Sequence, residues 1–291
     1  MSNLFVAVGN SATSGIANIG YSTDGETWNL ASNSNGNLNT STGLFNGVNG
    51  VNGRSVTYGN GRFVAVGKSN TGGTANIGYS TDGQNWFLAS NANTNLNPTT
   101  GLFNGGNGNS LTYGNGVFVA VGYSGTGGTA NIGYSTDGEN WFLASNANNN
   151  LNPTTGLFNG GGVNNSGNGV AYGNGVFVAV GQSGTFGTAN IGYSLDGQNW
   201  FLASNANTNL DPTTGLFNGG GGLGITFGNG IFVAVGESGT GGTTNIGYSA
   251  DGQNWFLASN ANNNLDPTTG YLIQVLDEMS LMGMAILWQW A

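Results

Sequence analysis

A tryptophan recurs along almost the whole chain and constrains its fold more than any other feature. Trp28, Trp86, Trp141, Trp200 and Trp255 are 58, 55, 59 and 55 residues apart, and each lies in the same local sequence. Although 291 residues would suffice for two ordinary domains, a spacing this regular indicates a repeat protein. We therefore expect one array built from five similar units.

Each unit predicts four short strands. In the third unit, residues 110–113 and 118–121 flank an Asn-Gly turn, and Asn-Gly between apolar runs is a strong hairpin signal. Two further strands, 130–135 and 141–144, follow it. Four strands in a repeat of this length are typical of a β-propeller blade, so the sequence predicts an all-β propeller of five four-stranded blades. The expected propeller covers residues 1–270, with blades at about 1–32, 52–90, 109–145, 168–204 and 224–259.

The turn before each repeated tryptophan resembles a known structural motif. Residues 134–141 read Tyr-Ser-Thr-Asp-Gly-Glu-Asn-Trp, which resembles the Asp box, S-x-D-x-G-x-x-W, of the BNR or sialidase-like propeller family. Here glycine directly follows the aspartate, a shorter variant that is similar to repeats in bacterial, phage and large-virus surface proteins. The resemblance implies a turn between the third and fourth strands of each blade. It also suggests a virion or cell-surface location, although no secretory leader is visible before Phe5.

We expect the Asp box to be structural, because serine and aspartate hydrogen-bond to turn backbone, glycine permits positive φ, and tryptophan packs beneath. The alternative is a calcium site, but one carboxylate per turn is few for an ion that takes about six to eight oxygen ligands. We therefore expect no metal and no cofactor. The residues assigned to the five boxes are Ser22, Asp24, Gly25, Trp28, Ser80, Asp82, Gly83, Trp86, Ser135, Asp137, Gly138, Trp141, Ser194, Asp196, Gly197, Trp200, Ser249, Asp251, Gly252 and Trp255.

Charge and composition exclude several functions. The net charge is −9 with only three basic residues, so a nucleic-acid backbone would be repelled. The chain has no cysteine and no histidine, which removes thiol and histidine mechanisms. The family resemblance would require three arginines for sialidase activity, and only Arg54 and Arg62 are present. Asp211 and Glu237 could in principle form the carboxylate pair of a glycoside hydrolase. Near-identical units, however, are poorly suited to building one asymmetric catalytic pocket. We expect no enzyme activity.

Strand alternation predicts which face binds a partner. The loops between the second and third strands, and those between blades, should emerge on one face, and these loops carry the variation among the repeats. Their Asn, Thr and Ser content suits sugar hydroxyls, so a multivalent glycan-binding module is one hypothesis. The other is a structural or adhesive surface module that binds proteins, and the oligomeric state stays open. Candidate ligand contacts, which follow the second strand of each blade, are Asn10, Lys68, Tyr123, Gln182 and Glu237. We expect Phe103, in the recurrent Leu-Phe-Asn of the long loops, to lie in the core.

The composition changes abruptly in residues 271–291. If the codon boundary moves one base earlier, Tyr271-Leu272-Ile273 can read Leu-Phe-Asn, and residues 284–291 can read Gly-Asn-Phe-Val-Ala-Val-Gly. Our hypothesis is that this segment is a sixth repeat shifted out of frame. A strand near residues 271–276 could complete the first blade, which begins at its second strand, and close the ring.

Overall fold

The structure of the protein, a computed structural model, consists of β-strands and turns. It describes residues 4–9, 19–31, 44–45, 52–68, 76–89, 102–103, 106–123, 131–144, 157–158, 166–182, 190–203, 217, 220–236 and 246–258. These ranges contain strands β1 to β19 and no helix, which confirms the expected all-β class. In the same ranges, therefore, no apolar helix of membrane-spanning length occurs.

The strands form five consecutive units, numbered 1 to 5 along the chain. Unit 1 contains β1 (Phe5–Val8), β2 (Ile19–Ser22) and β3 (Asn29–Leu30). Unit 2 contains β4 (Asn52–Gly59), β5 (Arg62–Lys68), β6 (Ile77–Ser80) and β7 (Phe87–Leu88). Unit 3 contains β8 (Asn107–Gly114), β9 (Val117–Tyr123), β10 (Ile132–Ser135) and β11 (Phe142–Leu143). Unit 4 contains β12 (Ser166–Gly173), β13 (Val176–Gln182), β14 (Ile191–Ser194) and β15 (Phe201–Leu202). Unit 5 contains β16 (Gly222–Gly228), β17 (Ile231–Gly236), β18 (Ile246–Ser249) and β19 (Phe256–Leu257).

Within a unit, neighbouring strands are antiparallel and follow the order of the chain. In unit 3, β8 pairs with β9, β9 with β10, and β10 with β11. Asn115 and Gly116 connect β8 to β9 with φ angles of 47° and 79°, the two positive values that a tight hairpin turn requires. The hairpin prediction is thus confirmed. The last strand is shorter than expected, because Trp141 closes the preceding turn instead, where its indole Nε1 donates to the carbonyl of Gly138 at 3.1 Å.

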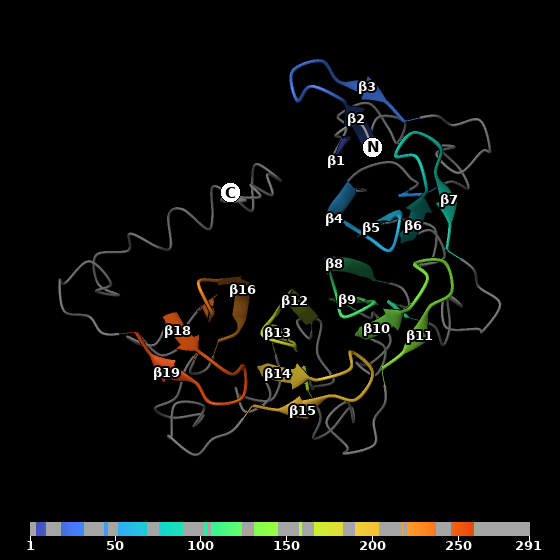
Figure 1. The fold of residues 1–291 in the computed structure, drawn as a ribbon. Helices are drawn as coiled ribbons and strands as arrows, with labels where there is room; N and C mark the ends of the chain where they lie inside the picture. Colours follow the sequence, from blue (N-terminus) through green and yellow to red (C-terminus); the bar gives the residue numbers. More distant parts are fainter. Residues whose placement is uncertain are drawn as a thin grey trace.

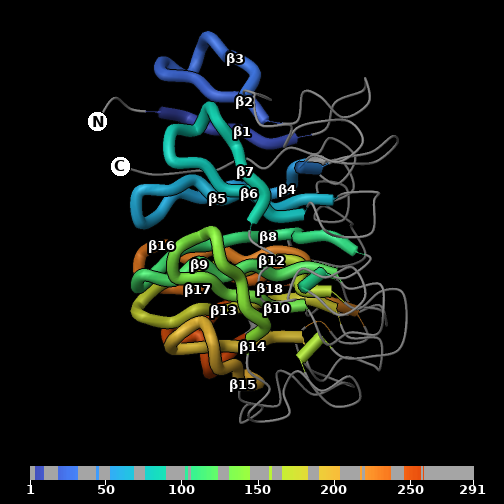
Figure 2. The backbone as a smooth tube through the Cα atoms, turned by 90° about the vertical axis from the view of Figure 1, so that its right-hand side faces the viewer, coloured from blue at the N-terminus to red at the C-terminus, as the bar shows by residue number. Residues whose placement is uncertain are grey.

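The units lie side by side in an open arc (Figure 1). The first strands of units 2 to 5 lie on the inner side of the arc, and the short last strands lie on its outer side. In the view turned by 90°, the hairpin turns and the turns before the last strands project from the same side (Figure 2), as strand alternation predicts. This arrangement is propeller-like.

Backbone pairs link consecutive units on the inner side of the arc. Lys68 at the end of β5 pairs with Asn107 of β8, and Tyr123 at the end of β9 pairs with Ser166 of β12. These pairs join units 2, 3 and 4 into one twelve-stranded sheet, whereas units 1 and 5 form sheets of three and four strands. The units are therefore connected by backbone as well as by side chains.

The hydrophobic core lies between consecutive units. Between units 2 and 3, Val64 and Val66 of β5 pack in one cluster with Phe118 of β9 and Trp141, and all four side chains are fully buried or nearly so. Equivalent clusters lie between units 3 and 4 and between units 4 and 5. Strands that are apolar on both faces, such as β9, follow from this stacking, because each is covered by a unit on either side.

A Leu-Phe pair fills the gap left by glycines at the junctions of units 1 and 2, 2 and 3, and 3 and 4. Leu102 and Phe103 are buried, as expected for Phe103, which has a φ of 55°. A Cβ at Gly133 would lie 2.2 Å from Leu102, and one at Gly122 would lie 2.8 Å from Phe103. Positive φ is costly for a bulky residue, so the full burial of the ring offsets a strained backbone.

The expected closed ring is not observed. In the described part of the chain, no sheet joins unit 5 to unit 1, and unit 1 has three strands instead of four. The arc therefore has two ends (Figure 1). The strand expected near residues 271–276, and the whole segment 271–291, lie outside the described residues.

Candidate binding surface

A turn containing Ser, Asp, Gly and Trp, here called the Ser-Asp turn, lies between the third and fourth strands of units 2 to 5 and between β2 and β3 of unit 1. In unit 3, the Ser135 hydroxyl donates to Asp137 Oδ1 at 3.0 Å and accepts from the amide of Gly138 at 2.8 Å. Asp137 Oδ1 also accepts from the amides of Glu139 and Asn140, at 2.9 and 2.7 Å, and Oδ2 accepts from the Asn140 side chain at 2.8 Å. The carboxylate is thus fully engaged in holding its own turn.

The same bonds recur in the other units with small differences. The tryptophan indole donates to the turn glycine at 3.0 to 3.1 Å in all five turns. Unit 1 differs because Thr27 replaces the asparagine that bonds the second carboxylate oxygen in the others, and its tryptophan is exposed. The Ser-Asp turn of unit 1 is therefore the least protected.

Hydrogen bonding lowers the pKa of every turn aspartate. For Asp24, the amides of Thr27 and Glu26, and then the Ser22 hydroxyl, lower the pKa from 3.8 to about 2. In the other four turns burial raises the pKa of the aspartate, but bonds from the following asparagine and the turn amides outweigh it, so the pKa is again lowered. Those four are Asp82, Asp137, Asp196 and Asp251. Such groups are ionised at neutral pH and have no proton to donate.

The glycine of each turn also fits the turn against the preceding unit. Gly138 has a φ of 76°, and a Cβ there would lie 2.7 Å from Val64 of β5. Only glycine satisfies both the backbone conformation and the close approach. Throughout the described ranges, no group of three or more acidic side chains could hold a metal ion.

Three of the five ligand residues proposed from the sequence are described. Lys68, Tyr123 and Gln182 end β5, β9 and β13 with half-buried side chains, and each pairs through its backbone with the next unit. Asn10 and Glu237 lie outside the described residues. The ligand-binding assignment of all five stays a prediction.

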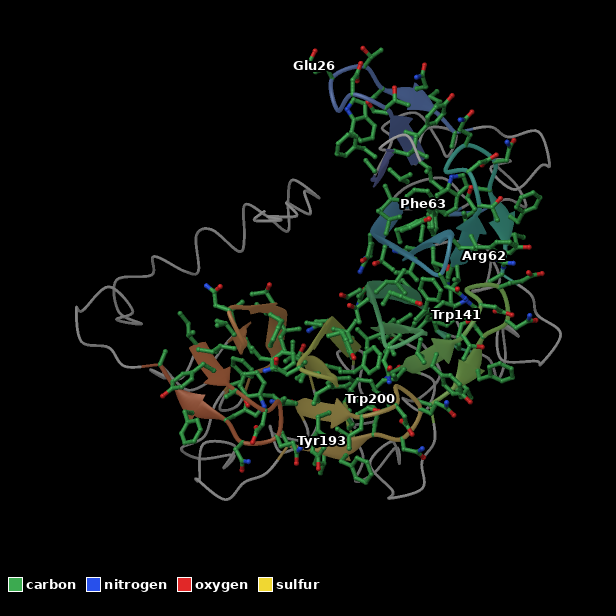
Figure 3. All side chains as sticks on the ribbon, viewed as in Figure 1. Glu26, Arg62, Phe63, Trp141, Tyr193 and Trp200 are labelled. Carbon is green, nitrogen blue, oxygen red and sulfur yellow. The ribbon has the colours of Figure 1, made fainter. Side chains whose placement is uncertain are left out.

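The structure reveals a repeated surface feature that was not predicted from the sequence. In units 2 to 5, a tyrosine of the third strand stacks against a phenylalanine of the fourth, with ring centroids 5.5 to 5.6 Å apart and planes 28° to 30° from parallel. Each pair consists of direct cross-strand partners, as Tyr134 and Phe142 show. Figure 3 places Tyr193 at the outer rim of unit 4. The four pairs are Tyr79–Phe87, Tyr134–Phe142, Tyr193–Phe201 and Tyr248–Phe256.

These aromatic pairs are partly open to solvent. Phe142 is 37% exposed and Phe256 is 42% exposed, and the other members are half-buried or exposed. The sequence contains the pattern that produces these pairs, because Tyr precedes the turn serine and Phe follows the turn tryptophan in units 2 to 5. Unit 1 has Asn29 at the phenylalanine position and lacks the pair. The surface thus carries one aromatic platform in each of four units.

Charged side chains surround only one described platform. Arg62 of unit 2 forms an ion pair with Glu139 of unit 3 at 3.0 Å, and its guanidinium lies 5.2 Å from the centre of the Tyr79 ring. Burial and the adjacent Glu139, which accepts a hydrogen bond from the tyrosine, raise the pKa of Tyr79. The platforms of units 2 and 3 therefore differ in polarity although their rings are alike.

The inner side of the arc carries polar side chains at a repeated β-bulge. Arg54, Asn109 and Asn168 occupy the bulge positions of β4, β8 and β12. Asn109 and Asn168 each donate to a carbonyl of the next unit's inner strand, at 2.9 and 2.8 Å. Arg54 donates to Asn109. These side chains connect the units.

Comparison with known proteins gives structural similarities alone. No protein-family model matches the chain. No curated protein matches it. Three solved structures are similar at low identity, and the chain spans less than two thirds of the length of each of them.

The first of these structures is YCF48 with a bound D1 peptide, at 17% identity and a TM-score of 0.42, with 86% of this chain and 63% of that chain covered. The second is the computationally designed protein Ika8, at 13% identity and a TM-score of 0.41, with 81% and 56% covered. The third is a putative glycoside hydrolase from Parabacteroides distasonis, at 14% identity and a TM-score of 0.37, with 67% and 66% covered. The all-β, propeller-like fold of this chain rests on its own strand order.

Proposed function

We propose that the chain is a non-catalytic Asp-box repeat propeller that binds glycans at several equivalent sites. The observation that carries the proposal is the recurrence of one stacked, partly exposed Tyr-Phe pair in units 2 to 5. The apolar face of a sugar ring packs on an aromatic ring, and the tyrosine hydroxyl supplies a polar group beside it. Each platform is shallow, so a single site binds weakly.

Repetition compensates for weak individual sites. Four similar platforms on one rigid arc can engage a branched or repeating glycan together, and linked weak contacts raise the overall affinity. The variable loops follow Lys68, Tyr123 and Gln182 at the strand ends opposite the Ser-Asp turns, so they would supply a second contact separate from the platforms. The proposal therefore combines a repeated aromatic base with residues that differ among the units.

The turn aspartates support a role without catalysis. Glycoside hydrolysis requires one carboxyl group with a raised pKa that can donate a proton. The five turn aspartates have the opposite property, because hydrogen bonding lowers their pKa. Their bonding supports a structural role for the Asp boxes.

The alternative function is that of a structural or adhesive module of a virion or cell surface that binds protein partners. A separate observation favours it, namely the exposed apolar side chains at the two ends of the arc. This function needs no sugar site, and it would leave the aromatic pairs as ordinary cross-strand contacts.

A glycan array with the purified chain, repeated with excess chelator, separates the two functions. We expect binding that the chelator leaves unchanged and that falls when Phe142 and Phe201 are replaced together by serine. Leu195→Ser is the matched control, because Leu195 is 56% exposed and belongs to no aromatic pair. Absence of binding to every glycan, or binding that the double variant retains in full, would refute the glycan proposal.

A further inference from the structure

The outward face of unit 1 exposes apolar residues whose described equivalents in the other units are buried or half-buried. Trp28 is 46% exposed, whereas its four equivalents are at most 1% exposed. Phe5 is 48% exposed, although its equivalent Phe118 in unit 3 is fully buried. Leu30 is 62% exposed. We call Phe5, Trp28 and Leu30 the leading face.

The opposite end of the arc exposes the complementary residues. Val233 of β17 is 37% exposed, whereas its equivalents Val64, Val119 and Val178 are fully buried. Ile231 and Tyr248 are each 42% exposed. We call Ile231, Val233 and Tyr248 the trailing face.

Internal junctions show what each face is shaped to contact. At the junction of units 4 and 5, Trp255 lies in one cluster with Val178, and the turn glycine Gly252 lies against Val178 and Val176. Val233 and Ile231 occupy the positions of Val178 and Val176 one unit further on. In unit 1, Gly25 and Trp28 occupy the positions of Gly252 and Trp255. The leading face is therefore equivalent to the surface that covers a trailing face at each junction between complete units.

We infer that the trailing face of one molecule binds the leading face of a second copy of this chain. The contact is heterologous, because two different surfaces meet, so it leaves a free face of each kind and can be repeated. Two arcs of five units exceed the roughly four to eight blades of ordinary propellers. The second copy must therefore tilt out of the plane of the first, and repetition gives a spiral rather than a flat ring.

One polar partner is kept at the proposed contact. At the junction of units 2 and 3, Glu139 pairs with Arg62 and accepts a hydrogen bond from Tyr79. In the docked pair, Glu26 of one copy is equivalent to Glu139. Ile231 and Tyr248 of the other copy are equivalent to Arg62 and Tyr79. The tyrosine partner is present, and the arginine is replaced by isoleucine. Ile231→Arg should therefore add the ion pair seen at the internal junction and strengthen the association.

The test measures the mass of the full chain by sedimentation velocity over a wide range of concentration. We expect the wild-type chain to form species larger than a monomer as concentration rises. Trp28→Ser and Val233→Asp should each remain monomeric, because each loses one of the two faces. Both changes lie at exposed positions, and circular dichroism checks that the fold is unchanged, because Trp28→Ser also removes the indole bond to the Gly25 carbonyl.

Mixing the two variants makes the test specific. Trp28→Ser retains its trailing face and Val233→Asp retains its leading face, so an equimolar mixture should form a dimer that grows no further. Ile231→Arg should shift association to lower concentration, and added salt should reverse that shift. A wild-type chain that stays monomeric at every concentration, or single variants that associate as well as the wild type, would overturn the inference. Glycan binding is measured separately, so each proposal can fail alone.

Discussion

Replacing Asp137 by alanine tests the role of the Ser-Asp turn most directly. The change removes an acceptor for the Ser135 hydroxyl and two backbone amides on Oδ1, and for the Asn140 side chain on Oδ2. Each hydrogen bond contributes about 0.5 to 1.5 kcal/mol net, and water partly replaces the acceptor at this half-buried site, so we expect a total loss of about 2 kcal/mol. The serine keeps its bond to Gly138, which limits the damage to the turn.

Equilibrium unfolding in urea at neutral pH measures this loss, with the denaturant slope as a check that the unfolded state is unchanged. Asp24→Ala is the matched control, because its turn amides are exposed and no asparagine side chain bonds its second oxygen. We expect the control to lose less stability than Asp137→Ala. Glycan binding should survive both changes. No loss in Asp137→Ala would refute the structural role of the turn aspartate, and equal losses in the two variants would refute the contribution of burial and of the asparagine bond.

Three further predictions concern pH, glycine and charge. The turn aspartates have lowered pKa values in the folded state, so their stabilisation is present above the ordinary aspartate pKa and is lost as pH falls below it, for Asp24 as pH falls through about 2; thermal unfolding across that range measures the loss. Gly197→Ala should cost about 3 kcal/mol, because φ is 75° and the new Cβ would lie 2.9 Å from Val119, whereas Gly175→Ala, with positive φ but open space, should cost about 1 kcal/mol. Equal costs in urea unfolding would contradict the packing argument. Arg62→Met should lose about 1 kcal/mol at low salt and less at high salt, since its partner Glu139 is 38% exposed; a salt-independent loss would point to packing instead.

Local sequence patterns were enough to identify the strands and turns. Asn115-Gly116 predicted a hairpin because few residues tolerate two successive positive φ angles, and the structure has that hairpin. Strand ends were less accurate. Trp141 was assigned to a strand on its apolar character, but its indole closes the turn, and a side-chain hydrogen bond of this kind is invisible in a hydrophobic pattern.

The candidate site was predicted only in part. Ligand contacts were expected from the residues that follow each second strand, whereas the Tyr-Phe platforms lie on the third and fourth strands, where strand register decides which rings meet. Tyr134 and Phe142 are eight residues apart, and only their pairing across β10 and β11 brings the rings together. The variable residues after each second strand were easy to find, but Lys68 and Tyr123 also pair with the next unit through their backbones.

The sequence by itself determined the all-β class, the number of repeats and the local turn chemistry, because these depend on residues close together in the chain. The tertiary structure alone decided which repeats have neighbours. Trp28 and Trp141 occupy the same position in nearly the same local sequence, yet one is 46% exposed and the other is fully buried. The difference arises because burial depends on the adjacent unit, and the described arc ends at unit 1 on one side and at unit 5 on the other.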